Sequence, residues 1–156
     1  MCEYCGCQAL DAIAELTAEH DLVVELSRQV RGALRAGDLD AAAERSRAVA
    51  AVLEPHTAVE EGALFPALAA DFGDHVAALE AEHRLVESVL AESAEGTPSD
   101  PSWPERLDRA LYLLREHILK EQDGVFPAAL AHLDPTQWEA LEAVRAVVGS
   151  GTRATA

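Results

Sequence analysis

The feature that most constrains the fold of this chain is a motif that occurs twice in the same register. A histidine is followed by glutamate four residues later and by Phe-Pro five residues after that, first from His56 and again from His117. A Glu-His pair precedes each copy at a similar distance, ending at His20 and at His83. In an α-helix, residues four apart differ by about 40° in direction and by about 6 Å along the axis, so each histidine and its glutamate aim at one point. The chain therefore looks like a duplicated pair of helices.

Composition and hydrophobic spacing predict helix almost everywhere outside the Gly and Pro clusters. Aromatic residues make up only 4% of the chain, alanine is abundant, and runs of β-branched residues are missing, all of which favours helix. Apolar residues recur at helical spacing in five segments. These are residues 10–34, 38–63, 74–90, 102–121 and a shorter last helix at 135–148.

Local signals place the helix boundaries. Pro55 should kink the second helix without ending it, and residues 71–74 separate the second helix from the third. Residues 95–101 form the longest connection. Ser102 and Glu105 predict a capping box for the fourth helix, and Asp134 begins the last one.

These segments predict an all-α fold, an antiparallel up-down four-helix bundle with an additional short C-terminal helix. The bundle and the last helix span residues 10–148. A Cys-containing segment, residues 1–9, precedes them, and a flexible tail, residues 149–156, follows. The last helix either caps one end of the bundle or pairs two chains, so the protein is a monomer or a homodimer, and we favour capping.

The repeated residues predict a metal centre. His20, His56, His83 and His117 lie on the apolar stripes of four helices, so folding would bring four imidazoles together with Glu60 and Glu121. Buried carboxylates need a compensating cation, and imidazole with carboxylate suits iron, manganese or zinc. Carboxylates at the centre of such a set can bridge two ions, which favours a dinuclear site.

Spacing alone is modest support, because acidic residues are frequent in this chain. His83 also has an acid four residues later, Glu87, and a single buried histidine is usually a core residue hydrogen-bonded to a neighbour. The doubled motif and the matched separations carry the metal hypothesis.

Charge excludes other classes of partner. Asp and Glu number 28 against 12 Lys and Arg, a formal net charge of −16, so we expect no nucleic-acid binding and no attachment to an anionic membrane. The chain has no apolar run long enough to cross a bilayer. The first residues lack a secretory signal, which predicts a cytoplasmic protein with mostly reduced thiols.

On these residues the chain resembles the hemerythrin family, in particular bacterial members with the His-His-Glu cation-binding domain, over about residues 10–130. The resemblance implies a non-haem di-iron centre with an oxo or hydroxo bridge. Glu60 and Glu121 would bridge the irons, and the histidines would be terminal ligands, with their pairing between the irons left open. These are His20, His56, His83 and His117.

The chain departs from the oxygen carriers of that family. They have a fifth histidine where Leu79 stands here, so one iron is short of a ligand, and Glu87 is a candidate replacement. They also have an aspartate five residues after the last histidine, where this chain has Gln122, so Glu121 is the sounder candidate. Asp123 points away from His117 and should be solvated.

The resemblance leaves two main functions and a weaker third. The first is a protein that binds or senses O2, NO, peroxide or iron itself, and the second is a catalase-like enzyme that decomposes peroxide at the same irons. More open metal positions favour reaction with small ligands over reversible oxygen carriage. The third is a structural bundle that holds zinc or manganese.

Three cysteines lie outside the resemblance, at Cys2, Cys5 and Cys7. They could bind zinc with a fourth ligand from His75 or His132, or form a reversible disulfide under oxidative stress. An inert tail is the other interpretation, in which both of these histidines are surface residues.

Overall fold

The computed structural model describes residues 6–153, and within this range it is all-helical, with no strand. The elements follow the predicted segments closely. They are α1 (Cys7–Arg35), α2 (Leu39–Val59), the π-helical turn η1 (Glu60–Leu64), α3 (Phe65–Ala91), α4 (Trp103–Lys120), a second π-helical turn η2 (Glu121–Val125), α5 (Phe126–His132), α6 (Pro135–Val148) and the 3₁₀ turn η3 (Gly151–Arg153).

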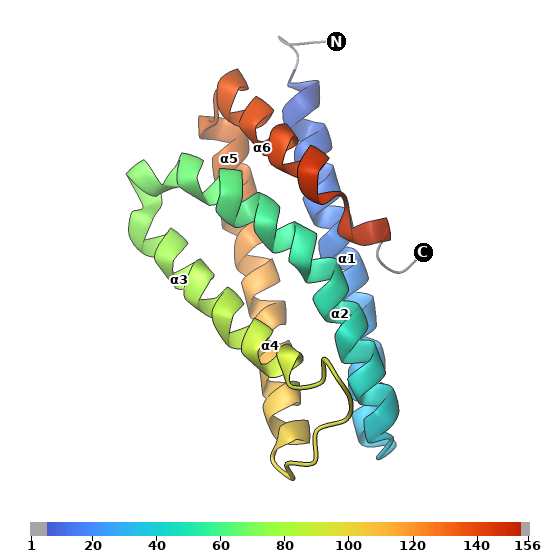
Figure 1. The fold of residues 1–156 in the computed structure, drawn as a ribbon. Helices are drawn as coiled ribbons and strands as arrows, with labels where there is room; N and C mark the ends of the chain where they lie inside the picture. The colour runs from blue at the N-terminus through green and yellow to red at the C-terminus, as the bar shows by residue number, and fades with distance from the viewer. Residues whose placement is uncertain (1–5, 154–156) are drawn as a thin grey trace.

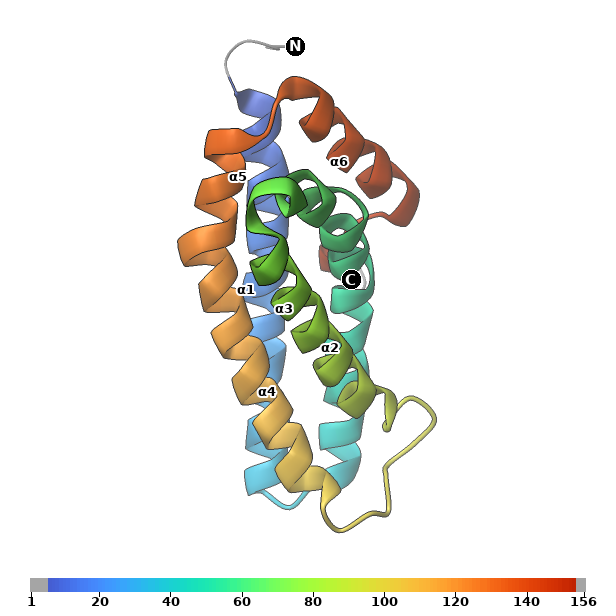
Figure 2. The same ribbon diagram turned by 90° about the vertical axis from the view of Figure 1, so that its left-hand side faces the viewer.

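Four helical rods form the bundle, as predicted (Figure 1). The second rod runs from α2 through η1 into the start of α3, and Pro55 does not end it. The chain then bends at Phe72, whose φ of −130° and ψ of 32° are non-helical. The rest of α3 returns along the bundle (Figure 2). The predicted break at residues 71–74 is therefore a sharp bend.

The connection between α3 and α4 is the longest in the described chain, but its predicted capping box is absent. The side chain of Ser102 caps no N–H group of α4. Its hydroxyl instead donates to Asp100 and accepts from Arg106. At the start of α6 the prediction is correct, because Asp134 and Gln137 form a complete capping box.

Two apolar clusters fill the bundle, one on each side of a polar layer. Along α1, for example, Leu16 belongs to one cluster and Val23 to the other, and His20 lies between them. The same order holds on α2, where Leu53 and Val59 flank His56 on opposite sides. The apolar layers thus hold the polar groups at mid-bundle, away from bulk water.

The last helix covers the side of the bundle formed by α1, α2 and η1, and it buries Trp138 and Leu141 against its own chain. Residues 149–153, which belong to the predicted tail, contact the bundle. Gly151 is buried and donates its N–H to Glu19. No helix in the described range is long and apolar enough to span a membrane.

Candidate metal centre

The structure brings the six repeated residues together inside the bundle. Each of the four rods contributes a histidine, and the two glutamates open the two π-helical turns. None of the six is more than 6% exposed. They are His20, His56, Glu60, His83, His117 and Glu121.

They form two overlapping groups that share both glutamates. His20 and His56 belong to one group, and His83 and His117 belong to the other. Within each group the candidate ligand atoms lie within 4.8 Å of one another. We name them the first-half site and the second-half site, after the half of the chain that supplies the histidines. Two buried groups sharing two carboxylates are consistent with a binuclear metal site.

All four imidazoles present Nε2 to the centre. The Nε2 atoms of His20 and His117 each lie 3.1 Å from Glu121 Oε1. Those of His56 and His83 lie 3.3 and 3.2 Å from Glu60 Oε1. The Nε2 atoms of His83 and His117 are only 3.0 Å apart.

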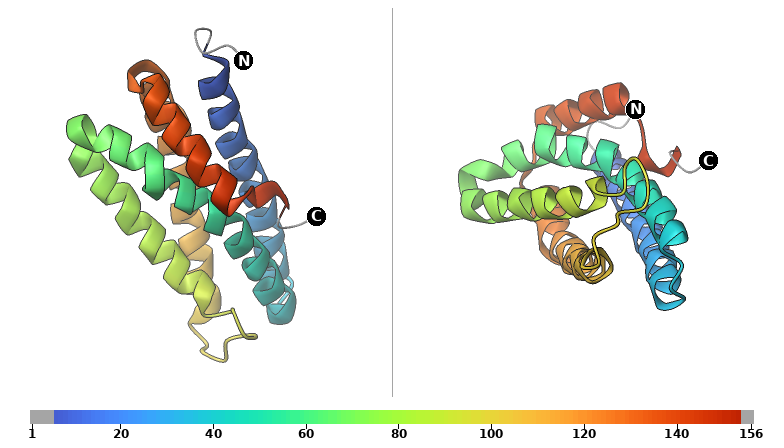
Figure 3. Two further views of the ribbon diagram at one scale, coloured as in Figure 1. Left: turned by 45° about the horizontal axis from the view of Figure 1, so that its top comes forward. Right: turned by 60° about the horizontal axis from the view of Figure 1, so that its bottom comes forward.

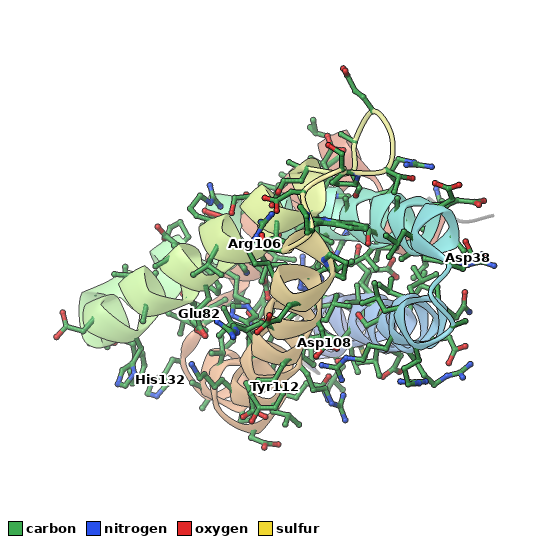
Figure 4. The ribbon with its side chains drawn as sticks, turned by 90° about the horizontal axis from the view of Figure 1, so that it is seen from below. Asp38, Glu82, Arg106, Asp108, Tyr112 and His132 are labelled. Atoms are coloured by element: carbon green, nitrogen blue, oxygen red, sulfur yellow. The ribbon has the colours of Figure 1, made fainter. Side chains whose placement is uncertain are left out.

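The outer nitrogen, Nδ1, of each imidazole faces an acceptor. The acceptor of His20 is Gln122 Oε1 at 3.1 Å, and those of His56 and His83 are Glu19 and Glu61, also at 3.1 Å. For His117 a carboxylate oxygen of Glu82 lies at 3.5 Å, and Nδ1 makes no hydrogen bond within the described residues. Such outer partners fix the orientation and tautomer of metal-binding histidines. Figure 4 shows Glu82 between α3 and α4, whereas Tyr112 points away from the bundle.

This arrangement requires a cation at the centre. An acceptor at Nδ1 places the proton of a neutral imidazole there and leaves the lone pair on Nε2. Lone pairs would then face carboxylate oxygens and each other at 3.0 to 3.3 Å. Both oxygens of Glu60 and one of Glu121 are buried without a hydrogen-bond partner. A metal ion between these atoms would satisfy all of them, so the donor set fits the dinuclear prediction.

The pKa values of His56 and Glu60 also indicate that the centre favours positive charge. Burial disfavours the charged form of His56, but the negative charge of Glu60, 3.3 Å away, and the hydrogen bond to Glu19 outweigh it and raise its pKa to about 10. Burial likewise opposes ionisation of Glu60, yet the neighbouring histidines hold its pKa well below the usual value. The centre thus favours bound cations, whether protons or metal ions.

Each π-helical turn also orients a histidine from another helix. In η1, Glu61 bonds His83, and Phe65 directly after the turn stacks on the same ring with centroids 5.6 Å apart. In the second copy, Gln122 bonds His20 and Phe126 stacks on it at 5.3 Å. π-helical turns are rare and occur often at functional sites. They explain why the repeated motif extends to Phe-Pro.

Sequence reasoning missed the outer residues, namely Glu19, Glu61, Glu82 and Gln122. Two of them were visible as the glutamate of each Glu-His pair, since Glu19 and Glu82 directly precede His20 and His83. A residue adjacent to a ligand points about 100° away from it on a helix, toward the neighbouring rod. In each half the glutamate of the Glu-His pair therefore faces the motif histidine of the same half: Glu19 faces His56 and Glu82 faces His117.

Glu87 is not a member of either group of candidate ligands. Its side chain is 41% exposed and pairs with Arg84 at 3.3 Å, three residues earlier on the same helix. That Glu87 replaces the missing imidazole stays a prediction. Leu79 is buried at 4% exposure, and Asp123 is exposed, as expected.

Of the proposed cysteine site, Cys2 and Cys5 lie outside the described residues, and Cys7 is exposed at the start of α1. The site stays a prediction. His75 and His132 are both exposed, as the surface interpretation predicts. Figure 4 shows His132 at the periphery, where its ring meets the edge of Phe72.

Comparison with known proteins agrees with this geometry. The family described as Hemerythrin HHE cation binding domain matches residues 11–129. This chain belongs to that family. The match spans all six inner residues of the hemerythrin-like centre and ends before α6. No curated protein and no solved structure matches the chain.

Proposed function

We propose that this protein binds two iron ions in its first-half and second-half sites and takes up O2, NO or peroxide there. The observation that carries the proposal is the convergence of four Nε2 atoms on two shared, otherwise unpartnered carboxylates. Imidazole with carboxylate is a donor set that suits iron, and two ions would balance the buried negative charge.

The histidine count supports binding of an external ligand. Each ion would have two imidazoles and a share of two carboxylates, so both would keep open coordination positions. Leu79 supplies no donor atom where the oxygen carriers have a histidine. Iron would contribute redox chemistry and affinity for diatomic ligands when bound.

The cavity at the centre is small. Its volume is about 10 Å³, which is room for about one water-sized group, and all four histidines and Glu121 line it. Leu53, Thr57 and Glu87 line both this cavity and a surface groove of about 790 Å³ between α2 and α3. This close packing favours a small ligand, which we propose reaches the centre from the groove.

Metal analysis and ligand titration test the proposal. Anaerobic loading with Fe²⁺ should give two ions per chain, and added NO should change the visible spectrum stoichiometrically. His56→Ala and Glu121→Ala should abolish this change. One ion or none per chain in the wild type would contradict the dinuclear site, and a preference for zinc or manganese over iron would support a structural bundle instead.

The same open positions favour a second candidate, the disproportionation of two H2O2 to O2 and two H2O. The buried carboxylate of Glu19 would keep His56 oriented during such turnover. Continuous O2 release from peroxide by the iron-loaded protein, lost in His56→Ala, would establish this enzyme. A single stoichiometric change without turnover would establish binding.

A further inference from the structure

The C-terminal helix lies outside the family match and yet reaches the metal centre. It crosses α2 and packs beside α1 and η1 (Figure 3). Arg145 of α6 holds Glu19 through two hydrogen bonds, of 2.9 and 2.8 Å. Glu19 is 0% and Arg145 17% exposed. This ion pair is therefore far more buried than those that Arg84 and Lys120 form near the centre.

Glu19 links α6 to a candidate ligand. Its Oε1 accepts from Arg145 and from His56 Nδ1, and its Oε2 accepts from Arg145 and from the N–H of Gly151 at 2.7 Å. The carboxylate is thus fixed from three directions. A Cβ at Gly151 would lie 2.5 Å from the Val52 carbonyl oxygen, so the turn fits closely over this group.

Glu82 occupies the equivalent position in the second half, and no buried arginine or backbone turn like those at Glu19 is seen against it in the described residues. Glu82 faces His117 and is held by Lys120 at 2.9 Å, but Lys120 is 58% exposed. A flexible, solvated ammonium fixes a carboxylate less firmly than a buried bidentate guanidinium does. The two metal sites therefore differ in how rigidly their outer partners are held.

We propose that Arg145 is a positioning residue for the first-half site, acting through Glu19 on the orientation of His56. This inference rests on the proposed dinuclear function. Together with the turn at Gly151, Arg145 fixes the Glu19 carboxylate, which holds Nδ1 of His56 and directs Nε2 to the ion. Loss of an outer partner of this kind typically costs 10 to 100-fold in metal affinity.

Titration of the metal-free protein with Co²⁺, followed by calorimetry and visible absorption, tests this role. The wild type should bind two ions. In Arg145→Met, one of the two should bind roughly 10 to 100-fold more weakly, while the other is unchanged, and Arg145→Lys should recover part of the loss. Lys120→Met should leave both affinities within about threefold of wild type, because solvated pairs contribute little.

Two further variants separate positioning from folding. Leu141→Ala loosens the packing of α6 without touching Glu19 and should keep both affinities. Glu19→Gln with Arg145→Met removes the buried charge, so the fold is retained, yet one ion should still bind weakly. Wild-type affinities in this double variant, or equal losses in Leu141→Ala, would overturn the inference. Fewer than two ions in the wild type would instead overturn the proposed function.

Discussion

At the scale of single residues, the centre is built from histidines with two different sides. The inner nitrogen, Nε2, faces carboxylate oxygens that need a cation. The outer nitrogen, Nδ1, bonds an acceptor in His20, His56 and His83 and lies 3.5 Å from Glu82 in His117. Three outer acceptors are carboxylates and the fourth, for His20, is the amide of Gln122. Because a neutral amide raises ligand basicity less than a carboxylate does, the four imidazoles are not equivalent donors.

Neighbouring glutamates on η1 should respond differently to neutralisation. Glu60→Gln should reduce the metal content from two ions per chain to at most one, because Glu60 belongs to both groups. Glu61→Gln should retain two ions, since the second half already uses glutamine at the corresponding place. Metal analysis after anaerobic Fe²⁺ loading measures both. Equal losses in the two variants would refute the division into inner and outer acceptors.

Stability of the metal-free protein should fall as pH rises above neutral. The folded pKa of His56 is raised to about 10 from its ordinary value of 6.5. Its contribution to the stability is therefore complete below about pH 6.5 and is lost as pH rises through about 10. Urea unfolding of chelator-treated protein at pH 6, 8 and 10 measures this trend. His56→Asn should flatten it, and a stability that increases toward pH 10 would contradict the assignment.

At the scale of elements, the π-helical turns η1 and η2 and the C-terminal turn at Gly151 position the side chains around the centre. Each π-helical turn begins with a glutamate that belongs to both groups of candidate ligands. The next residue, Glu61 or Gln122, bonds Nδ1 of a histidine on another helix. The C-terminal turn reaches the same layer from outside, where Gly151 lies against Val52 and Glu19. Space at this glycine is therefore tightly restricted.

Gly151→Ala should lower the free energy of unfolding by about 1–3 kcal/mol, because its Cβ would meet backbone at a forbidden distance. Gly124 in η2 is the matched control, since no neighbouring atom lies within 4 Å of its Cβ position. Gly124→Ala should be neutral or stabilise by up to about 1 kcal/mol. Denaturant titration compares them, and a neutral Gly151→Ala would show that the turn is loosely held.

The elements were largely predictable and the outer contacts were not. Helical spacing and the capping residues at Asp134 locate helices because these signals are local. The convergence of the six inner residues followed from their place on apolar stripes. The bond from Arg145 to Glu19 joins residues far apart in the chain, and no periodicity encodes it. For Glu87, which pairs with Arg84, the i+4 spacing from His83 does not determine which way the side chain turns.

At the scale of the whole molecule, the surface charge opposes the compact state. The formal net charge is −16, and like charges repel more strongly when salt is dilute. The Debye length falls from about 30 Å at 0.01 M to about 8 Å at 0.15 M salt. Added salt should therefore stabilise the fold.

Thermal unfolding of the chelator-treated protein should shift upward by a few degrees when NaCl is raised from 10 to 150 mM. Near pH 4.6, the sequence isoelectric point, the same addition should have little effect, because the net repulsion has vanished. An equal salt effect at both pH values would exclude self-repulsion as its source.

The two halves of the chain contribute equally to the candidate metal centre. Each half supplies both imidazoles of one ion and only one of the two shared carboxylates. A half-length chain that associated with itself about a two-fold axis would thus complete the same centre. The two halves of this chain differ in the acceptor after the shared glutamate, Glu61 in one and Gln122 in the other, and the Arg145 guanidinium lies beside the first-half site.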